Sequence, residues 1–308
     1  MSRFIFKNSA KRFAWLSKPG WWLEAGLLKL FWFWVKRSGV DQAAEKGSWL
    51  FRKLGPHVRK HQHVLKNLSI AFPELEQEER EKLAVEAWGN FGAVLAEYPF
   101  MDKMVAGEEA ARNEIELSDA SRPIVENKLP AVYIAAHLGS YEIPAATLAR
   151  LGVGITSVYA PQSNPFADRM VQRYREPLGM TLVPKENAIR TLVKEIRKGR
   201  SLGLLPDQRN DSGELVPFFG VDAPTVTSPA WLAIKMNVPL VPIQVERIGH
   251  SRFRIVFHDP IDTHAEIEDI QERLYETTKQ VNACFEQWIR KHPEQWHWTK
   301  RRWPRRDK

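Results

Sequence analysis

Short apolar runs alternate with amphipathic stretches from residue 130 to the end of the chain, and this alternation constrains the fold more than any other feature. An apolar run of about four to eight residues predicts a buried strand, and apolar residues at three- and four-residue spacing predict a helix. The strands expected on this basis are 131–136, 155–159, 201–205, 240–245 and 253–257. The helices expected are 142–151, 166–178, 186–198, 228–236 and 265–291.

Strands that are apolar throughout and separated by helices are typical of a sheet buried on both faces. We therefore expect an α/β fold with a central mixed, mostly parallel sheet flanked by helices. The last two strands are expected to form a hairpin around Gly249. Nearer the N-terminus, residues 76–98 predict a helix that Pro99 ends, and residues 40–70 predict either a linker or a pair of helices.

The segment Phe13–Lys36 is apolar with basic flanks, and from residue 21 onward only Glu24, Gly26 and Lys29 interrupt it before Lys36. Its two tryptophan pairs lie about 12 residues, or roughly 18 Å of helix, apart, whereas a hydrocarbon core is roughly 30 Å thick. We expect a hydrophobic membrane-anchor helix that lies in one leaflet, with its aromatic side down and its lysines at the headgroups.

A helix that spans the bilayer and a buried core helix are the alternatives for this segment. The expected organisation is therefore a membrane anchor or interfacial helix over residues 1–38 and a second domain over residues 39–308.

The net charge of +8 is distributed unevenly. Residues 1–60 carry +10 and residues 300–308 carry +5, so the body of the chain is mildly acidic. Basic ends that are also rich in tryptophan suit an anionic membrane surface, and a nucleic acid or simple solubility are the competing explanations. The single cysteine, Cys284, excludes an intramolecular disulfide, a thiolate zinc site and an iron–sulfur cluster.

His137 directly follows the apolar run 131–136, and Glu142 comes five residues later. On a continuous helix these side chains would point apart, but Gly139 permits a bend between a strand and a helix. At such a turn the carboxylate can hold one imidazole nitrogen, and the other nitrogen becomes a general base for a hydroxyl. A structural histidine that bonds to the backbone at a strand end is the alternative.

Other polar groups are expected near the same sheet edge. Arg169 and Arg173 share a helical face, which suits phosphate recognition, although an exposed, solvated face explains them equally. Asp207 and Gln208 end the predicted strand 201–205, and the carboxyl edge of an α/β sheet is where ligands bind. Ser228 and Pro229 are expected at the N-cap and first position of a helix, whose N-terminus can hold an anion.

Five sequence blocks follow one another in order. They are His137-Leu-Gly-Ser-Tyr-Glu142, Asn164-Pro165 with Arg175, Pro206-Asp207-Gln208, Val216-Pro-Phe-Phe-Gly220 with Thr225, and Pro293-Glu-Gln-Trp296-x-Trp298 with Arg301-Arg302. They resemble the late acyltransferases of lipid A biosynthesis, the lauroyl/myristoyl transferase family of Gram-negative bacteria. The resemblance covers essentially the whole chain, including an N-terminal hydrophobic anchor. The resemblance implies a glycerol-3-phosphate acyltransferase-like fold, with residues 39–308 as the acyltransferase domain.

The resemblance also implies a reaction. A fatty acyl chain would pass from acyl carrier protein to a hydroxyl of a Kdo-bearing lipid A precursor, without an acyl-enzyme, a metal or another cofactor. His137 would deprotonate the hydroxyl and Glu142 would orient His137. Arg175, or one of its neighbours Arg169 and Arg173, would supply the working cation, and Asp207 with Gln208 would order the arginine or the substrate. The enzyme would act on an anionic membrane surface, at the cytoplasmic face of the inner membrane, and would bind no nucleic acid.

Some positions depart from the family pattern. Leu138 and Ser140-Tyr141 stand where the family more often has Phe and an Asn-Trp pair, which leaves the acyl length and the acceptor open. An acyltransferase for a lysophospholipid, an amino-acid lipid or another glycolipid, and a non-catalytic lipid-binding protein of the same fold, are the alternatives.

Overall fold

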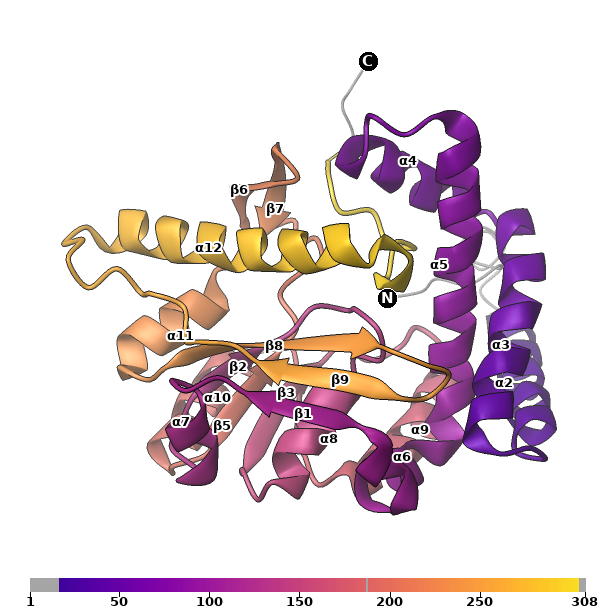
Figure 1. Ribbon diagram of the computed structural model, residues 1–308, viewed down its shortest axis with the longest axis horizontal. Helices are drawn as coiled ribbons and strands as arrows, with labels where there is room; N and C mark the ends of the chain where they lie inside the picture. The colour runs from indigo at the N-terminus through magenta and orange to yellow at the C-terminus, as the bar shows by residue number, and fades with distance from the viewer. Residues whose placement is uncertain (1–16, 187, 305–308) are drawn as a thin grey trace.

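The computed structural model describes residues 17–186 and 188–304 of the 308-residue chain. In these ranges the central sheet has seven strands in the order β1-β9-β8-β2-β5-β3-β4 (Figure 1). The strands are β1 (Glu114–Leu117), β2 (Val132–Ile134), β3 (Ile155–Tyr159), β4 (Thr181–Pro184), β5 (Ser201–Leu204), β8 (Leu240–Arg247) and β9 (Phe253–Phe257). Only β8 and β9 pair antiparallel, so the mixed, mostly parallel α/β sheet is confirmed.

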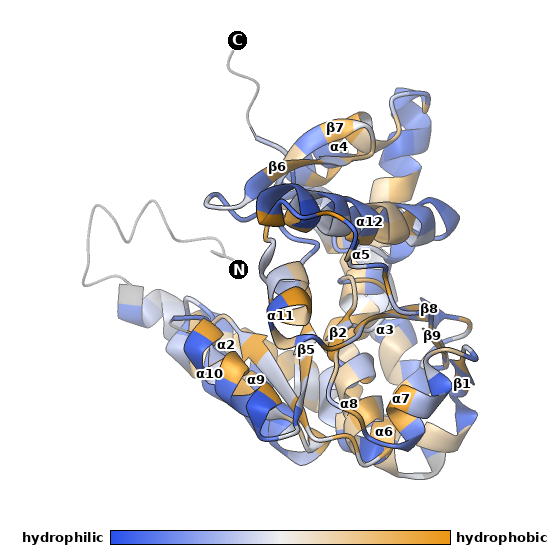
Figure 2. Ribbon diagram, turned by 90° about the vertical axis from the view of Figure 1, so that its left-hand side faces the viewer, coloured by the Kyte–Doolittle hydropathy of each residue, from blue (hydrophilic) through white to orange (hydrophobic). Residues whose placement is uncertain are grey.

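Helices cover both faces of the sheet, because successive side chains of each strand point to opposite sides. Tyr133 of β2 belongs to one apolar core, and its neighbours Val132 and Ile134 belong to another. The first core lies under α6 (Met101–Ala106), α7 (Arg122–Glu126), α8 (Ile143–Arg150) and α9 (Pro165–Arg175). The second lies under α10 (Ala188–Arg197), α11 (Ser228–Met236) and α12 (Ile270–Lys291). In Figure 2, α8 and α11 carry hydrophobic colours where they pack on the sheet, whereas α12 is largely hydrophilic.

Four of the helices that precede β1 stand together at one end of the sheet (Figure 1). They are α2 (Ser17–Val35), α3 (Val40–Leu54), α4 (His61–Ala71) and α5 (Gln77–Glu97). The predicted helix 76–98 is therefore confirmed, and residues 40–70 form a pair of helices rather than a linker. Helices α3 and α5 approach closely at Gly47 and Gly92, where a Cβ atom on either glycine would lie within 2.3 Å of the other backbone.

Helix α2 buries one face and exposes another. Ala25, Trp32 and Val35 are buried, and the indole of Trp32 donates a hydrogen bond to the backbone of Leu95 in α5. The expectation that the aromatic side faces lipid is therefore wrong for Trp32. The exposed face carries large apolar side chains, of which Trp22 and Leu30 are 63% and 62% exposed.

No helix in the described ranges is both long enough and apolar enough to cross a bilayer. Residues 1–16, the first part of the expected anchor, and the basic residues 305–308 lie outside the described chain.

Several element boundaries differ from the sequence predictions for local reasons. Helix α12 begins at Ile270, because the Asp269 carboxylate caps its first turn by accepting from Gln271 and Glu272. Thr227, not Ser228, occupies the N-cap position of α11. Four strands were not predicted: β1, β4, and the two-stranded hairpin of β6 (Glu214–Phe218) and β7 (Val221–Thr225). The described residues also form short 3-10 turns at Gly55–His57, Tyr98–Phe100, Glu108–Arg112, Glu176–Leu178 and Pro293–Gln295.

Candidate active site

The register of two neighbouring parallel strands brings His137 and Asp207 together. Ile134 of β2 pairs with Leu204 of β5, and each of the two polar residues follows three positions later. The imidazole Nδ1 of His137 lies 2.6 Å from Asp207 Oδ1, and the backbone N–H of His137 donates to Oδ2 at 2.9 Å. One carboxylate therefore fixes both the ring and the backbone of the histidine at the carboxyl edge of the sheet.

Asp207 is completely buried and stays ionised. Burial alone would raise the pKa of this carboxyl, but its electrostatic attraction to His137 and the hydrogen bonds from the ring and backbone of His137, with a further bond from Trp296, lower the pKa to about 2. The indole of Trp296 donates to Oδ2 at 2.7 Å. Because an ionised carboxylate only accepts hydrogen bonds, His137 must carry its proton on Nδ1. Its Nε2 atom is then the nitrogen with a free lone pair.

The expected partnership of His137 with Glu142 is wrong in this structure. Glu142 Oε1 accepts hydrogen bonds from Arg175 Nε at 3.0 Å and from the Tyr98 hydroxyl at 2.8 Å, with a second, shorter contact to the Arg175 guanidinium. Glu142 is the N-cap residue of α8, so the chain has turned away from the strand before its side chain emerges. The predicted bend is confirmed, because Gly139 has a φ of +57°.

The pair formed by Glu142 and Arg175 is buried and internally satisfied. Burial alone would lower the pKa of the Arg175 guanidinium, but the charge of Glu142 raises it above its ordinary value. Burial, and then Glu142, raise the pKa of the Tyr98 hydroxyl, which therefore remains a donor. The next residue, Tyr141, packs its ring 4.9 Å from the ring of His137. This cluster supports the histidine from the side without bonding to it.

The C-terminal segment forms another wall of the site. The backbone of Gly139 donates to Gln295 at 3.1 Å, and the backbone of His297 donates to His137 at 3.0 Å. Trp296, Trp298 and Trp303 are all buried, so the expectation that the aromatic tail meets lipid headgroups is wrong for these side chains. The sequence contained a signal for this role, because a tryptophan-rich segment after a long helix can supply core as readily as surface.

His297, which lies next to His137, is held in the neutral form. Its ring lies 6.2 Å from the ring of His137. Burial, then the electrostatic effects of His137, Lys300 and Lys60, push the pKa of His297 well below its ordinary value. Its Nε2 atom lies 2.6 Å from the Thr299 hydroxyl. His297 therefore adds a polar, uncharged surface to the site.

A narrow cavity of about 10 Å³ lies against His137, with room for about one water molecule. Its apolar wall is formed by Val64 of α4 and by Ala87, Phe91 and Val94 of α5. His297 contributes to the opposite wall. An acyl chain can enter this space only if side chains move apart.

The other residues predicted for the site contact groups other than His137. Arg169 is exposed and lies over the ring of Phe166 at 5.1 Å, and Arg173 is also exposed, so neither contacts His137 or Asp207. Gln208 accepts a hydrogen bond from Lys300. Asn164 caps α9 by accepting from the first-turn amides and donates to Trp21 in α2.

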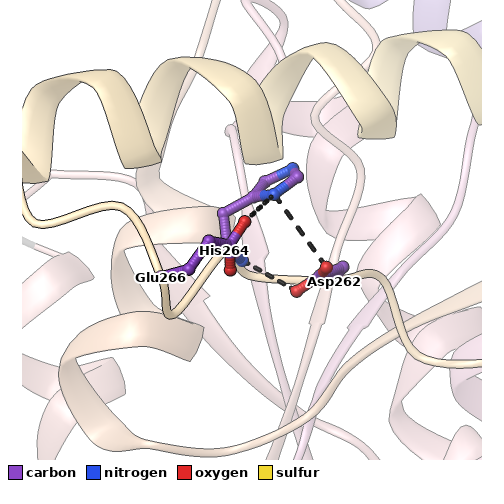
Figure 3. Close-up of side chains that lie close together, drawn as sticks. All are labelled: Asp262, His264 and Glu266. Carbon is purple, nitrogen blue, oxygen red and sulfur yellow. Dashed lines mark hydrogen bonds and ion pairs between the residues drawn. The ribbon is translucent and has the colours of Figure 1, made fainter.

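Two further groups have possible chemistry. Cys284 lies in α12, where burial raises the pKa of its thiol to about 12, so it is not a thiolate nucleophile. Asp262, His264 and Glu266 gather in the loop before α12 within 4.8 Å of one another (Figure 3). His264 Nδ1 already contacts Glu266 at 3.0 Å, and both carboxylates are exposed, so these residues pair locally and stabilise the loop.

Known proteins are similar to this chain over most of its length. A family model described as bacterial lipid A biosynthesis acyltransferase matches residues 6–305. The chain is 22% identical to the lipid A biosynthesis palmitoleoyltransferase of Escherichia coli, over 94% of this chain and 93% of that protein. It is 24% identical to the lipid A biosynthesis myristoyltransferase of the same organism, over 80% of this chain and 75% of that protein.

Among solved structures, the chain is similar to the 1-acyl-sn-glycerophosphate acyltransferase PlsC of Thermotoga maritima, at 14% identity and a TM-score of 0.37. The match covers 86% of this chain and 97% of that one.

Proposed function

Because this chain belongs to the bacterial lipid A biosynthesis acyltransferase family, and is thus an acyltransferase acting in lipid A biosynthesis, we propose that it moves a fatty acyl group from acyl carrier protein to a hydroxyl of a lipid A precursor. The observation that supports the chemistry is the contact of a buried, ionised Asp207 with Nδ1 of His137. A histidine held in this way presents Nε2 as a base.

The proposed step balances without a covalent enzyme intermediate. His137 Nε2 takes the proton of the acceptor hydroxyl while the oxygen attacks the thioester carbonyl. The carbon–sulfur bond breaks, the thiolate leaves, and the imidazolium returns the proton to it. During the step the positive ring is stabilised by Asp207, which is already fixed by Trp296 and by the backbone of His137.

Glu142 and Arg175 have a positioning role in this proposal. They join α8 to α9 through a buried ion pair and hold Tyr98 beside them. Tyr141, which follows the turn at Gly139, then packs on the imidazole and restricts its rotation. Arg175 is occupied by Glu142, so the proposal assigns it to the support of the site rather than to the reacting oxygen.

A transfer assay tests this function directly. Purified protein in detergent is supplied with acyl carrier proteins that carry chains of different length, and with Kdo₂-lipid IVA, its monoacylated product or a lysophospholipid as acceptor. Mass spectrometry is expected to show one added acyl chain on a lipid A precursor with the wild type and none with His137→Ala. Transfer to the lysophospholipid alone would contradict the proposed acceptor, and turnover by His137→Ala would contradict the proposed base.

We also propose that α2 attaches the enzyme to the anionic cytoplasmic face of the inner membrane. Leu23, Leu27 and Leu30 are each more than half exposed along one side of the helix. Large exposed apolar patches mark interaction sites. The basic residue Lys29 lies exposed on the same helix, and the exposed Lys36 directly follows it. An apolar helix with basic residues suits the interface of an anionic bilayer.

Vesicle flotation tests this attachment. Replacing Leu23, Leu27 and Leu30 by Ser is expected to release the protein from vesicles that contain anionic phospholipid. The matched control replaces three exposed apolar residues elsewhere, Leu129, Ile189 and Leu215, by Ser. Equal flotation of the two variants would contradict a role of α2.

A further inference from the structure

Two lysines from distant parts of the chain lie around His297, in the C-terminal wall of the site. Lys60 directly precedes α4, and Lys300 follows the aromatic segment that forms the C-terminal wall of the site. Both act electrostatically on His297, whose own backbone donates to His137. Lys300 also acts electrostatically on Lys60. The fold therefore gathers two ammonium groups around His297, whose ring lies 6.2 Å from that of His137.

Residues close to both lysines in the chain line the cavity at His137. Val64, one helical turn after Lys60, lines the cavity, and so does Thr299, the residue before Lys300. Asn67 of α4 donates to the backbone of Lys300 at 2.6 Å and to that of Trp298 at 2.8 Å. Helix α4 and the C-terminal segment are thus bonded together, which fixes the places from which the two lysine side chains extend.

The Lys300 ammonium is directed toward the site by a neutral group. It donates to the amide oxygen of Gln208, the residue next to Asp207. Asp207 also attracts Lys300, but its two oxygens already accept from the ring and backbone of His137 and from Trp296. The exposed Lys185, after β4, adds a further positive charge that acts on Lys300.

Positive charges held close together raise the free energy of the folded protein, and a bound anion would lower it. Burial, and then the charge of Lys300, lower the pKa of Lys60 to about 8. Burial, with Lys185 as a further cause, also lowers the pKa of Lys300. A lysine ammonium is a compact charge with three donors, which suits a phosphate oxygen.

We propose that Lys60 and Lys300 form a phosphate-binding site beside His137, with Gln208 positioning Lys300. The proposal rests on the acyl-transfer function above, since that reaction supplies two phosphate-bearing substrates. The acceptor carries phosphate on its sugars, and the acyl carrier protein carries a phosphodiester at the base of its thioester arm. The site lies close to the reacting histidine, whereas the long arm separates the donor phosphodiester from its thioester. The acceptor phosphate is therefore the expected occupant.

Chemical labelling tests the site without relying on turnover. A lysine with a lowered pKa reacts faster with an amine-acylating reagent, and mass spectrometry measures the rate at each lysine. The probe is Kdo₂-lipid IVA before and after treatment with a phosphatase. We expect the phosphorylated lipid to slow labelling of Lys60 and Lys300 about tenfold, and the dephosphorylated lipid to leave it unchanged. Lys66, exposed on α4, is the matched control. Equal protection by both lipids, or protection by neither, would overturn the proposal.

Steady-state kinetics identify the source of the phosphate. Lys60→Gln and Lys300→Gln are each expected to raise KM for the acceptor about ten- to hundredfold with a small change in kcat. Lys66→Gln is expected to change neither constant. A raised KM for acyl carrier protein instead would assign the site to the donor phosphodiester, and an unchanged KM for both substrates in two folded variants would overturn the proposal. If wild type shows no transfer, the proposed function fails, whereas the labelling result still decides whether the lysines bind phosphate.

Discussion

Asp207 and Glu142 are two buried carboxylates close to one histidine, and only one of them bonds to it. Glu142 is five residues from His137 in sequence and lies in an ion pair with Arg175. Asp207 is 70 residues away and contacts the ring and the backbone of His137. Strand register, rather than distance along the chain, determines which carboxylate meets the histidine. The comparison also separates a group poised for proton transfer from a group that holds two helices together.

The largest expected effect follows removal of the Asp207 charge. In Asp207→Asn the amide can donate to Nδ1, which moves the imidazole proton to Nε2 and removes the base. We expect kcat to fall about 10²- to 10⁴-fold while circular dichroism shows a folded protein. Single-turnover kinetics with saturating donor measure the loss. A folded variant with near wild-type turnover would show that Asp207 does not prepare His137.

Removal of the Glu142 charge is expected to act mainly on stability. Glu142→Gln leaves Arg175 as an uncompensated buried charge, which costs about 3–5 kcal/mol in the free energy of unfolding. The fall in kcat of the folded fraction is expected to be about tenfold, much smaller than for Asp207→Asn. Urea unfolding and activity per folded molecule measure the two effects.

A double-mutant cycle provides the control for that experiment. Changing Glu142 and Arg175 together to Gln removes both charges, so stability is expected to recover part of the loss. If the double variant is no more stable than Glu142→Gln, the ion pair does not explain the role of Glu142.

Trp296→Phe is expected to change only the environment of Asp207, and to lower kcat less than Asp207→Asn does. The change removes one donor to an ionised carboxylate, so the pKa of Asp207 rises and kcat falls about tenfold. The acidic limb of the pH–rate profile should move to higher pH. Trp298→Phe is the matched control, because its indole donates to the backbone of Pro293 and not to Asp207. Identical profiles for the two variants would contradict the role given to Trp296.

The smallest expected effect is a pH dependence of stability. His297 is held in the neutral form, so its folded pKa lies below the unfolded value of about 6.5. The unfolded state therefore binds the proton first, and stability falls as the pH is lowered below about 6.5. Asp207 acts in a separate window, because its contribution is present above about pH 3.9 and is lost as the pH falls toward its folded pKa of about 2.

Unfolding at a series of pH values checks this order. His297→Gln should flatten the loss of stability between about pH 6.5 and 5, and should leave the loss below about pH 4 in place. If His297→Gln leaves the upper window unchanged, another group causes it.

Much of the sheet was predictable because its strands are apolar runs between clear breaks. Strand β3 covers the residues expected from sequence, and β8 with β9 form the expected hairpin. The edge strands β1 and β4 were missed because they are short and carry few fully buried residues. The hairpin of β6 and β7 turns at Phe219-Gly220, where both residues have a positive φ. It was missed because the block Val216–Gly220 was interpreted as part of the family resemblance and not as a turn.

The site was only partly predictable, since its geometry depends on contacts between distant segments. His137, Asp207 and Gln208 were all identified as polar residues at strand ends, but their pairing requires the register of β2 and β5. A sequence argument that assumed these two strands to be neighbours would have found it, because both polar residues follow at the same offset. The roles of Trp296 and Lys300 depend on where the C-terminal segment folds back, and no local pattern specifies that.

Nitrogen-15 NMR of the histidine rings tests the central claim most directly, because it reports the bond to His137 without relying on activity. His137→Gln assigns the His137 signals among those of the nine histidines. The account predicts an Nδ1-protonated ring whose proton is shifted downfield by the carboxylate, a signal lost in Asp207→Asn and kept in Glu142→Gln. Loss of that signal in Glu142→Gln, with its retention in Asp207→Asn, would contradict the account.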